Sequence, residues 1–344
     1  MTINVAVVTS ESIVMGCDSI SSAMGVYLNP FESLERDENG NAVADAEGNW
    51  TAKFPPSSLR HVVTWARSGV TKMFPLCADH NPVAATTAGL AALNGKNIAN
   101  LVLEFRRRFP CEDHDTVRQV AADFCNFMSE QYEQHFAGDP TPLSFRPDVE
   151  FLVGGYGSSE AFPSLYRINL KNPVESRLTP QNGIGEEFPL GPGITWAGQA
   201  DAVERLLFGY DQRLKTAIHT AAQRQLRKLN RDMSDAVLTN LQGAFAQHGV
   251  PLPADLEIDL PSLQDLELPW NALHLDIDVA NIPLQDAIDF ASYLVNLQSG
   301  RATFSSGVPT VGGRTHIGVV SRNGFRMLNE PELVHRNTGY DRSI

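Results

Sequence analysis

The chain has 344 residues, 42% of them hydrophobic, and a formal net charge of −13. That length is enough to bury a large core, whereas the acidic balance argues against nucleic-acid binding, which needs a basic surface. No window approaches the roughly 18 consecutive apolar residues of a membrane span. The N-terminus lacks the basic start of a signal peptide, so we expect a cytoplasmic protein with no membrane partner.

The first predicted element is a β-hairpin. Short apolar runs lie on either side of a polar stretch at Ser10, a pattern typical of two strands joined by a tight turn. A turn centred on Ser10 pairs Val8 with Ser12. The same register pairs Thr2 with Asp18, so a carboxylate is expected beside the first hydroxyl of the chain. The alternative is that Asp18 only opens the polar turn that follows it.

Thr2 directly follows the initiator Met1. A threonine that becomes the N-terminus carries a nucleophilic Oγ and an α-amine that can take its proton. Lys72 lies among apolar residues in the predicted strand 69–74. A Lys⁺ near that amine disfavours its protonated form, and the amine's reference pKa of about 7.7–8.0 is already close to working pH. Asp18 would keep the lysine charged and oriented. The alternative is a surface lysine whose stem covers apolar neighbours.

The next stretch is rich in turns, and Asn39-Gly40 indicates a tight hairpin. We expect an inserted hairpin or flap over about 24–68, close to the mouth of the active site. It would gate substrate, contact a neighbouring subunit, or remain a solvated loop. A helix capped by Asn94 is predicted to end in the basic run 106–108, whose charges suit the helix dipole. A second helix is predicted over about 115–135.

The second half of the chain is predicted to be largely helical. The pattern favours a nearly continuous helix over 199–247, an extended acidic segment over 251–270 and a further helix over 283–297. The inserted region at about 207–273 is the best candidate for a subunit contact or a regulatory element. We expect the polar tail at about 328–344 to be mobile or to reach a neighbour.

Several classes of site are not expected. The four cysteines lack CxxC spacing, and buried thiols are favoured over disulfide or metal roles. The nine histidines form no HExxH motif and no helical pair with acid support, and no phosphate-binding glycine motif follows a strand. No repeat or low-complexity tract is expected either. We therefore predict no cofactor and no metal.

Several stretches, in order, resemble the proteasome β-subunit superfamily of N-terminal nucleophile hydrolases. The nearest types are the bacterial ancestral β-subunit (Anbu) and HslV-like proteasome-type proteases. The matching stretches are 2–22, 71–74, 85–91, 152–156 with 163–168, and 312–320. The resemblance implies an α+β fold, specifically a four-layer αββα sandwich formed by a single domain over 1–344 with two insertions.

The resemblance also implies roles for individual residues. The implied catalytic residues are the nucleophile Thr2, the tuning pair Asp18 and Lys72, and Gly89, whose N–H would form the oxyanion hole. The implied substrate-binding residues are Ser19, Ser22, Thr87 and Ala91. Since Thr87 and Ala91 are small, we expect a roomy specificity pocket.

The sequence departs from the family pattern in the outer residues that support the amine and a water. The family's Ser after the strand at 194–198 is replaced by Gln199, with Asp201 close by. The family's Asp and Ser before the glycine pair at 312–313 fall in 305–311, which contains no acid. Whether Gln199, Asp201, Ser305, Ser306 or Thr310 replaces these residues stays open.

Three functions follow from these observations. The first is a threonine peptidase that cleaves peptides or unfolded proteins within a homo-oligomeric ring or spiral, with any ATP-dependent unfoldase as a separate partner. The second is an N-terminal nucleophile amidase for a small amide. The third is a catalytically weak or inactive structural subunit, for which the missing outer acid argues.

Overall fold

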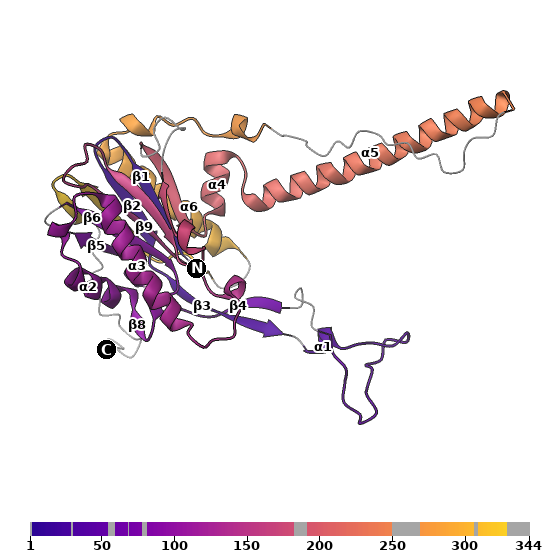
Figure 1. The fold of residues 1–344 in the computed structure, drawn as a ribbon, viewed down its shortest axis with the longest axis horizontal. Helices are drawn as coiled ribbons and strands as arrows, with labels where there is room; N and C mark the ends of the chain where they lie inside the picture. Colours follow the sequence, from indigo (N-terminus) through magenta and orange to yellow (C-terminus); the bar gives the residue numbers. More distant parts are fainter. Residues whose placement is uncertain are drawn as a thin grey trace, which may run out of the picture. The chain divides into compact units, whose positions relative to one another are not determined.

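The computed structural model describes residues 2–28, 30–53, 59–67, 69–77, 81–181, 191–249, 269–305 and 309–328 (Figure 1). The chain divides into two compact units. One comprises Met1–Ala200 with Asp278–Ile344, and the other comprises Asp201–Ile277. The candidate site described below lies wholly in the first unit.

The first unit contains two five-stranded antiparallel sheets. The first sheet has the order β12 (Gly193–Gly198), β1 (Ile3–Val8), β2 (Ile13–Asp18), β13 (Thr315–Ser321) and β14 (Gly324–Met327). The second has the order β11 (Leu178–Gln181), β10 (Ser164–Asn169), β9 (Val149–Gly155), β6 (Val83–Gly89) and β5 (Met73–Cys77). β1 and β9 are buried along their whole length, and each has a neighbouring strand on both sides.

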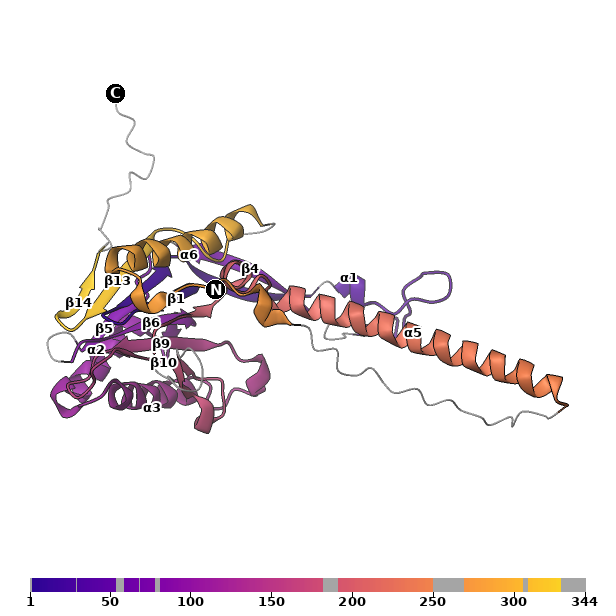
Figure 2. The same cartoon turned by 90° about the horizontal axis from the view of Figure 1, so that it is seen from above.

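Each sheet has its own helical partner (Figure 2). α6 (Leu284–Phe304) packs on β1, β2 and β13, whereas α2 (Ile98–Arg108) and α3 (Val117–His135) pack on the second sheet. The two sheets also contact each other through a shared apolar cluster that includes Met15, Met73 and Leu152. The expected mixture of helices and sheets is therefore confirmed.

The remaining elements are short or lie in insertions. They are β3 (Ser21–Leu28), α1 (Pro30–Ser33), β4 (Leu59–Arg67), β7 (Ala92–Leu93), β8 (Lys96–Asn97), and the 3₁₀ turns Cys111–Asp113, Leu143–Phe145, Val174–Ser176 and Val279–Asn281. β3 and β4 pair with each other and begin and end the predicted flap region. Residues 54–58 of that region, the tail from 329 onward and most of the predicted extended segment lie outside the described residues.

The second unit contains α4 (Asp201–Phe208), α5 (Gln212–Gln247) and the 3₁₀ turn Trp270–Leu273. The helix predicted as nearly continuous over 199–247 is thus divided into two helices. Gly209 adopts a positive φ of 76°, and Asp211 caps α5 by accepting from the backbone N–H of Leu214. Among the described helices, none is long and apolar enough to cross a membrane.

The predicted hairpin forms, but its register is wrong by one residue. Val8 pairs with Ile13 rather than with Ser12. Thr9 causes the shift, because its Oγ1 accepts from the backbone N–H of Ser12 and its own N–H donates to the Ser12 carbonyl. The turn therefore runs from Thr9 to Ser12 and is centred between Ser10 and Glu11 instead of on Ser10. Ile3, not Thr2, consequently comes opposite Asp18.

Helix boundaries also differ from the prediction. Asn97, not Asn94, caps α2 by accepting from the backbone N–H of Asn100 at 2.8 Å. Asn94 lies in the turn before β8 with a positive φ of 50°, and its amide donates to the Gln131 carbonyl. α6 continues to Phe304, seven residues beyond the predicted end at 297.

The flap region contains a repeat that was not expected. The segments Asp37–Asn41 and Asp45–Asn49 form the same turn. In each, the aspartate Oδ1 accepts backbone N–H groups two and four residues on, and a glycine adopts a φ near +85°. These hydrogen bonds, foremost the backbone one from Asn41, lower the pKa of Asp37 below its ordinary value. The prediction of no repeat is wrong for this segment.

The cysteine prediction is half right. Cys17 and Cys125 are buried thiols, but Cys77 and Cys111 form a disulfide with Cα atoms 5.6 Å apart. The packing of α2 on β5 brings the end of the strand beside the turn that follows the helix. Sequence spacing alone does not reveal this contact.

Candidate active site

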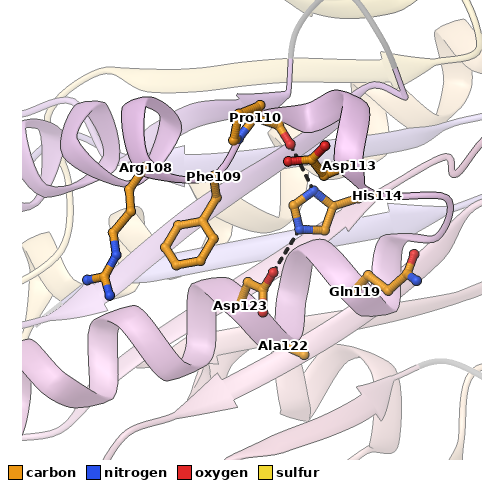
Figure 3. A pocket seen from close by; sticks show the side chains of 8 residues that line it. All are labelled: Arg108, Phe109, Pro110, Asp113, His114, Gln119, Ala122 and Asp123. Carbon is orange, nitrogen blue, oxygen red and sulfur yellow. Dashed lines mark hydrogen bonds and ion pairs between the residues drawn. The ribbon is translucent and has the colours of Figure 1, made fainter.

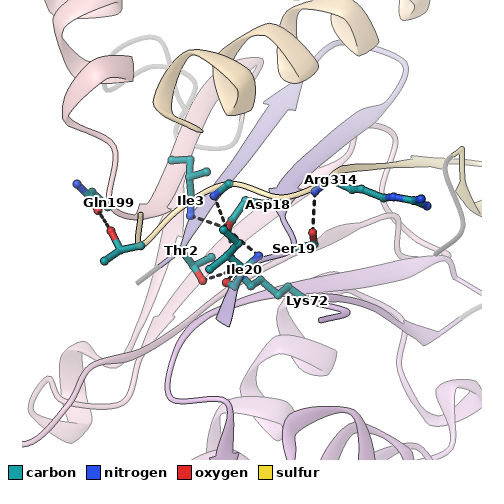
Figure 4. A network of polar contacts seen from close by, with 10 residues as sticks. Thr2, Ile3, Asp18, Ser19, Ile20, Lys72, Gln199 and Arg314 are labelled. Atoms are coloured by element: carbon teal, nitrogen blue, oxygen red, sulfur yellow. Dashed lines mark hydrogen bonds and ion pairs between the residues drawn. The ribbon is translucent and has the colours of Figure 1, made fainter. Parts of the chain in front are cut away.

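Three of the predicted catalytic side chains meet at the start of β1 (Figure 4). Thr2 immediately precedes β1, Asp18 is the last residue of β2, and Lys72 immediately precedes β5. Their exposed fractions are 4%, 1% and 4%. The two sheets therefore each contribute to a buried polar cluster, in which Lys72 comes from the second sheet.

Lys72 is the centre of this cluster. Its Nζ donates to Thr2 Oγ1 at 2.6 Å and to Asp18 Oδ1 at 2.7 Å, and it also donates to the Ile20 carbonyl. Burial lowers the pKa of Lys72, while the charge of Asp18 acts in the opposite direction. The threonine hydroxyl is thus in direct contact with a nitrogen whose ammonium form is destabilised by desolvation.

Asp18 is held by four donors. Oδ1 accepts from the backbone N–H of Ile3 at 3.1 Å as well as from Lys72. Oδ2 accepts from the backbone N–H groups of Ile20 at 3.1 Å and Gly312 at 3.0 Å. A buried carboxylate requires such partners, and together they fix its orientation toward Lys72.

A small cavity opens beside this cluster. Its lining residues are Thr2, Ser21, Ser22, Val70, Lys72, Thr87, Ala88, Gly89, Leu90, Ala91 and Ile98. Its volume of about 30 Å³ gives room for only a few water molecules, each of which needs roughly 10–15 Å³. The cavity is therefore not the roomy pocket that was expected, and Val70, Leu90 and Ile98 line it together with the small residues.

Most of the predicted binding residues reach the cavity, and one does not. Ser22, Thr87 and Ala91 line it together with Gly89. Ser19 is fully buried outside the lining, and its hydroxyl accepts from the backbone N–H of Arg314 at 2.8 Å. Ser19 thus joins the end of β2 to the segment before β13. Ser21 also lines the cavity, although no motif in the sequence singled it out.

Gly89 has a backbone that other residues would not adopt easily. Its φ is +100°, and a Cβ at this position would lie 1.9 Å from the carbonyl oxygen of Asp148. Glycine is thus required both for its conformation and for its close approach to β9. The predicted oxyanion donor is therefore on a backbone that tolerates no side chain.

The outer residues left open by the sequence are now located. The Gln199 backbone N–H donates to the Thr2 carbonyl at 2.7 Å, and its Oε1 accepts from Thr310 Oγ1 at 3.0 Å. Ser305 caps the end of α6 and donates to the Arg301 carbonyl. Asp201 opens α4 in the second unit, and Ser306 lies outside the described residues. Gln199 thus contacts Thr2 directly, and Thr310 contacts Gln199.

A larger hollow lies between α2 and α3 (Figure 3). Its volume is about 300 Å³. Within it, His114 Nε2 lies 2.8 Å from Asp123 Oδ2, and His114 Nδ1 lies 3.2 Å from the Pro110 carbonyl. It shares no lining residue with the cavity at Thr2. Across the described ranges, no group of three or more His, Cys, Asp or Glu residues could hold a metal ion.

Of the comparisons with known proteins, only the one with solved structures found similar proteins. No protein-family model matches the sequence, and no curated protein matches it. The chain is similar to an Anbu Gly-1 mutant from Hyphomicrobium sp. strain MC1, with 10% identity and a TM-score of 0.48 over 96% of this chain and 85% of that chain. A further Anbu structure from the same organism has 10% identity and a TM-score of 0.45 over 95% of this chain and 85% of that chain.

These structural neighbours are of the Anbu type that the motifs resemble. At 10% identity and TM-scores of 0.48 and 0.45, this likeness does not establish what this chain does.

Proposed function

We propose that the protein is an N-terminal threonine hydrolase of the proteasome type, in which Thr2 becomes the nucleophile once Met1 is removed. The observation that carries this proposal is the contact of Lys72 Nζ with Thr2 Oγ1 at 2.6 Å and with Asp18 Oδ1 at 2.7 Å. A hydroxyl, an amine and a carboxylate in one buried cluster form the arrangement that nucleophilic catalysis requires. Because apolar packing often stabilises a core as well as a buried ion pair does, stability alone does not account for this cluster.

The proposal extends to the fold. The helix α6, the two facing sheets and the pair α2 and α3 would be the four layers of an αββα sandwich. Contacts of each helix with its sheet, and of the sheets with each other, support this assignment. The first unit would then be the catalytic sandwich, and the second unit would be an insertion into it.

The proposed reaction begins when Thr2 Oγ attacks an amide carbonyl and its proton passes to the free Thr2 α-amine. Lys72 favours the neutral amine by like-charge repulsion and stabilises negative charge that develops on Oγ. The Gly89 N–H donates to the oxyanion. The C–N bond then breaks as the ammonium returns its proton to the leaving amine, and water hydrolyses the resulting ester of Thr2.

Peptide bonds are the proposed substrate, and a homo-oligomer is the proposed assembly, with any ATP-dependent unfoldase as a separate protein. The narrow cavity beside Thr2 favours small side chains next to the scissile bond. The same observation favours the second candidate, an amidase for a small amide. Activity on short acyl-amides without activity on peptides would select the amidase.

The intact mass of the purified protein before and after incubation with a β-lactone tests the nucleophile. We expect loss of Met1 and one adduct per chain, and we expect Thr2→Ala to lose the adduct while remaining folded. Thr2→Ser is the matched variant, since it retains a hydroxyl and should retain the adduct. A retained Met1, or a free Thr2 that forms no adduct, would instead indicate a structural subunit.

A further inference from the structure

Glu150 is a buried carboxylate that the proposed reaction does not use. It is the second residue of β9 and is 8% exposed. In the pairing of β6 with β9 it lies opposite Ala88, and its neighbour Val149 lies opposite Gly89. Glu150 is therefore on the strand next to β6, which carries the proposed oxyanion donor.

The two oxygens of Glu150 bind groups from different sheets. Oε1 accepts from Arg167 at 2.7 Å and from the Asn169 amide at 3.0 Å, both on β10 of its own sheet. Oε2 accepts from the backbone N–H of Gly198 at 3.1 Å, and Gly198 is the last residue of β12 in the other sheet. These partners together satisfy the hydrogen-bonding needs of one buried carboxylate. Glu150 therefore links the two sheets through hydrogen bonds.

Gly198 in turn contacts the proposed nucleophile. It lies opposite Ile3, and the next residue, Gln199, donates its backbone N–H to the Thr2 carbonyl at 2.7 Å. Gly198 has a φ of +81°, and a Cβ on it would lie 2.1 Å from the Thr2 carbonyl oxygen. The end of β12 and the backbone of Thr2 are thus in such close contact that movement of one displaces the other.

We infer that Glu150 is a positioning residue that holds Thr2 in register with the proposed oxyanion donor by fixing the Gly198–Gln199 corner. This inference rests on the proposed function. Lys72 and Asp18 join the two sheets beside the side chain of Thr2. The carboxylate of Glu150 joins them beside the backbone of Thr2, through the N–H of Gly198. The distance between a nucleophile and an oxyanion donor must be set closely, because displacement by about 1 Å can cost about 100-fold in rate.

The test is the second-order rate constant for β-lactone acylation of Thr2, measured by intact mass, in Glu150→Ala, Glu150→Gln and Arg167→Gln. Arg167→Gln is the matched control, because it removes the ion pair on the same carboxylate without touching β12. We expect Glu150→Ala to react about 10- to 100-fold more slowly while still reaching one adduct per chain. Glu150→Gln retains an oxygen that can accept from Gly198, so its rate constant should lie between those of Glu150→Ala and the wild type. Arg167→Gln should lower the melting temperature but keep the wild-type rate constant.

Hydrogen exchange of the segment 193–200 provides an independent readout, since the Gly198 amide should exchange faster in Glu150→Ala than in Arg167→Gln. If Glu150→Ala does not fold, the test is the comparison of acylation rate constants between Glu150→Gln and Arg167→Gln. We expect the rate constant of Glu150→Gln to be the lower of the two. A wild-type rate constant in the Glu150 variants, or an equal loss in Arg167→Gln, would overturn the inference. Absence of an adduct on the wild-type protein would overturn the proposed function instead.

Discussion

At the residue scale, removing the charge of Lys72 should lower both the free energy of unfolding and the rate of adduct formation, and a second substitution should restore part of the former only. Lys72→Met leaves Asp18 as a buried carboxylate without its cation, and loss of one partner of a buried pair costs about 3–5 kcal/mol. The double variant Asp18→Asn with Lys72→Met should recover part of that stability, because no unpaired charge remains, while the amide oxygen of Asn can accept from only one of the two sets of backbone N–H groups. Neither variant should form the β-lactone adduct at the wild-type rate.

Chemical unfolding and intact mass measured on the same samples check this prediction. Recovery of the adduct along with stability in the double variant would contradict the role proposed for Lys72. Lys72→Arg is a useful further control, since it keeps the positive charge but not the compact ammonium that contacts Thr2 Oγ1.

His316 should make the stability of the protein depend on pH. The side chain is 2% exposed, lies opposite Cys17, and has an Nδ1 without a hydrogen-bond partner among the described residues. Burial, and then the charges of Lys72 and Arg314 against that of Asp18, lower the pKa of His316. The folded state therefore binds this proton less readily than the unfolded state does.

It follows that the contribution of neutral His316 is fully present above the unfolded pKa of about 6.5 and is lost as the pH falls below it. The limiting slope is about 1.4 kcal/mol per pH unit. Urea unfolding at pH 7.5 and pH 5.5 should show a larger loss for the wild type than for His316→Leu, which cannot titrate. Equal losses in the two proteins would exclude His316 as the source.

At the scale of elements, the disulfide between Cys77 and Cys111 should stabilise the join between β5 and the turn after α2. It closes a loop with a sequence separation of 34, for which a stabilisation of about 2–4 kcal/mol is typical. Cys111→Ser should therefore lower the free energy of unfolding by that amount, and a reductant should lower the wild type to the same value. The variant itself should not respond to reductant, and a response of equal size in Cys111→Ser would point to another cause.

Local patterns in the sequence predicted most of these elements, whereas contacts between distant segments were harder to infer. The apolar spacing of α3 and the two short runs around Ser10 are local, and both elements form. The order of Thr2, Asp18 and Lys72 along the chain indicated a shared site, although the hairpin register was wrong by one residue because a side chain, Thr9, closes the turn.

Other features depend on tertiary packing and left no comparable signal. Glu150 reads as one acid in an apolar strand, and only the facing β12 shows what its second oxygen binds. The partner of Cys77 is likewise set by how α2 packs on β5, since spacing cannot assign disulfide connectivity. The small cavity is lined by apolar side chains from different elements as well as by Thr87 and Ala91, and the sequence does not show that they come together.

At the scale of the whole molecule, the surface of α5 bears on the proposed homo-oligomer. This 36-residue helix contains no buried residue. Leu229, Met233 and Val237 are spaced four residues apart and are 50%, 48% and 38% exposed, so they share one helix face. A helix of this length gains most of its stability by packing an apolar face, and in a homo-oligomer a second copy of the chain would cover it.

The triple variant Leu229→Gln, Met233→Gln and Val237→Gln should therefore reduce the mass of the assembly, whereas the wild type should be a multiple of the 37.7 kDa chain. The matched control is Arg224→Gln, Arg231→Gln and Asp235→Asn, because these residues lie on the opposite face of the same helix. Mass photometry at several concentrations distinguishes the two variants. If the apolar variant keeps the wild-type mass, the assembly does not depend on this face of α5.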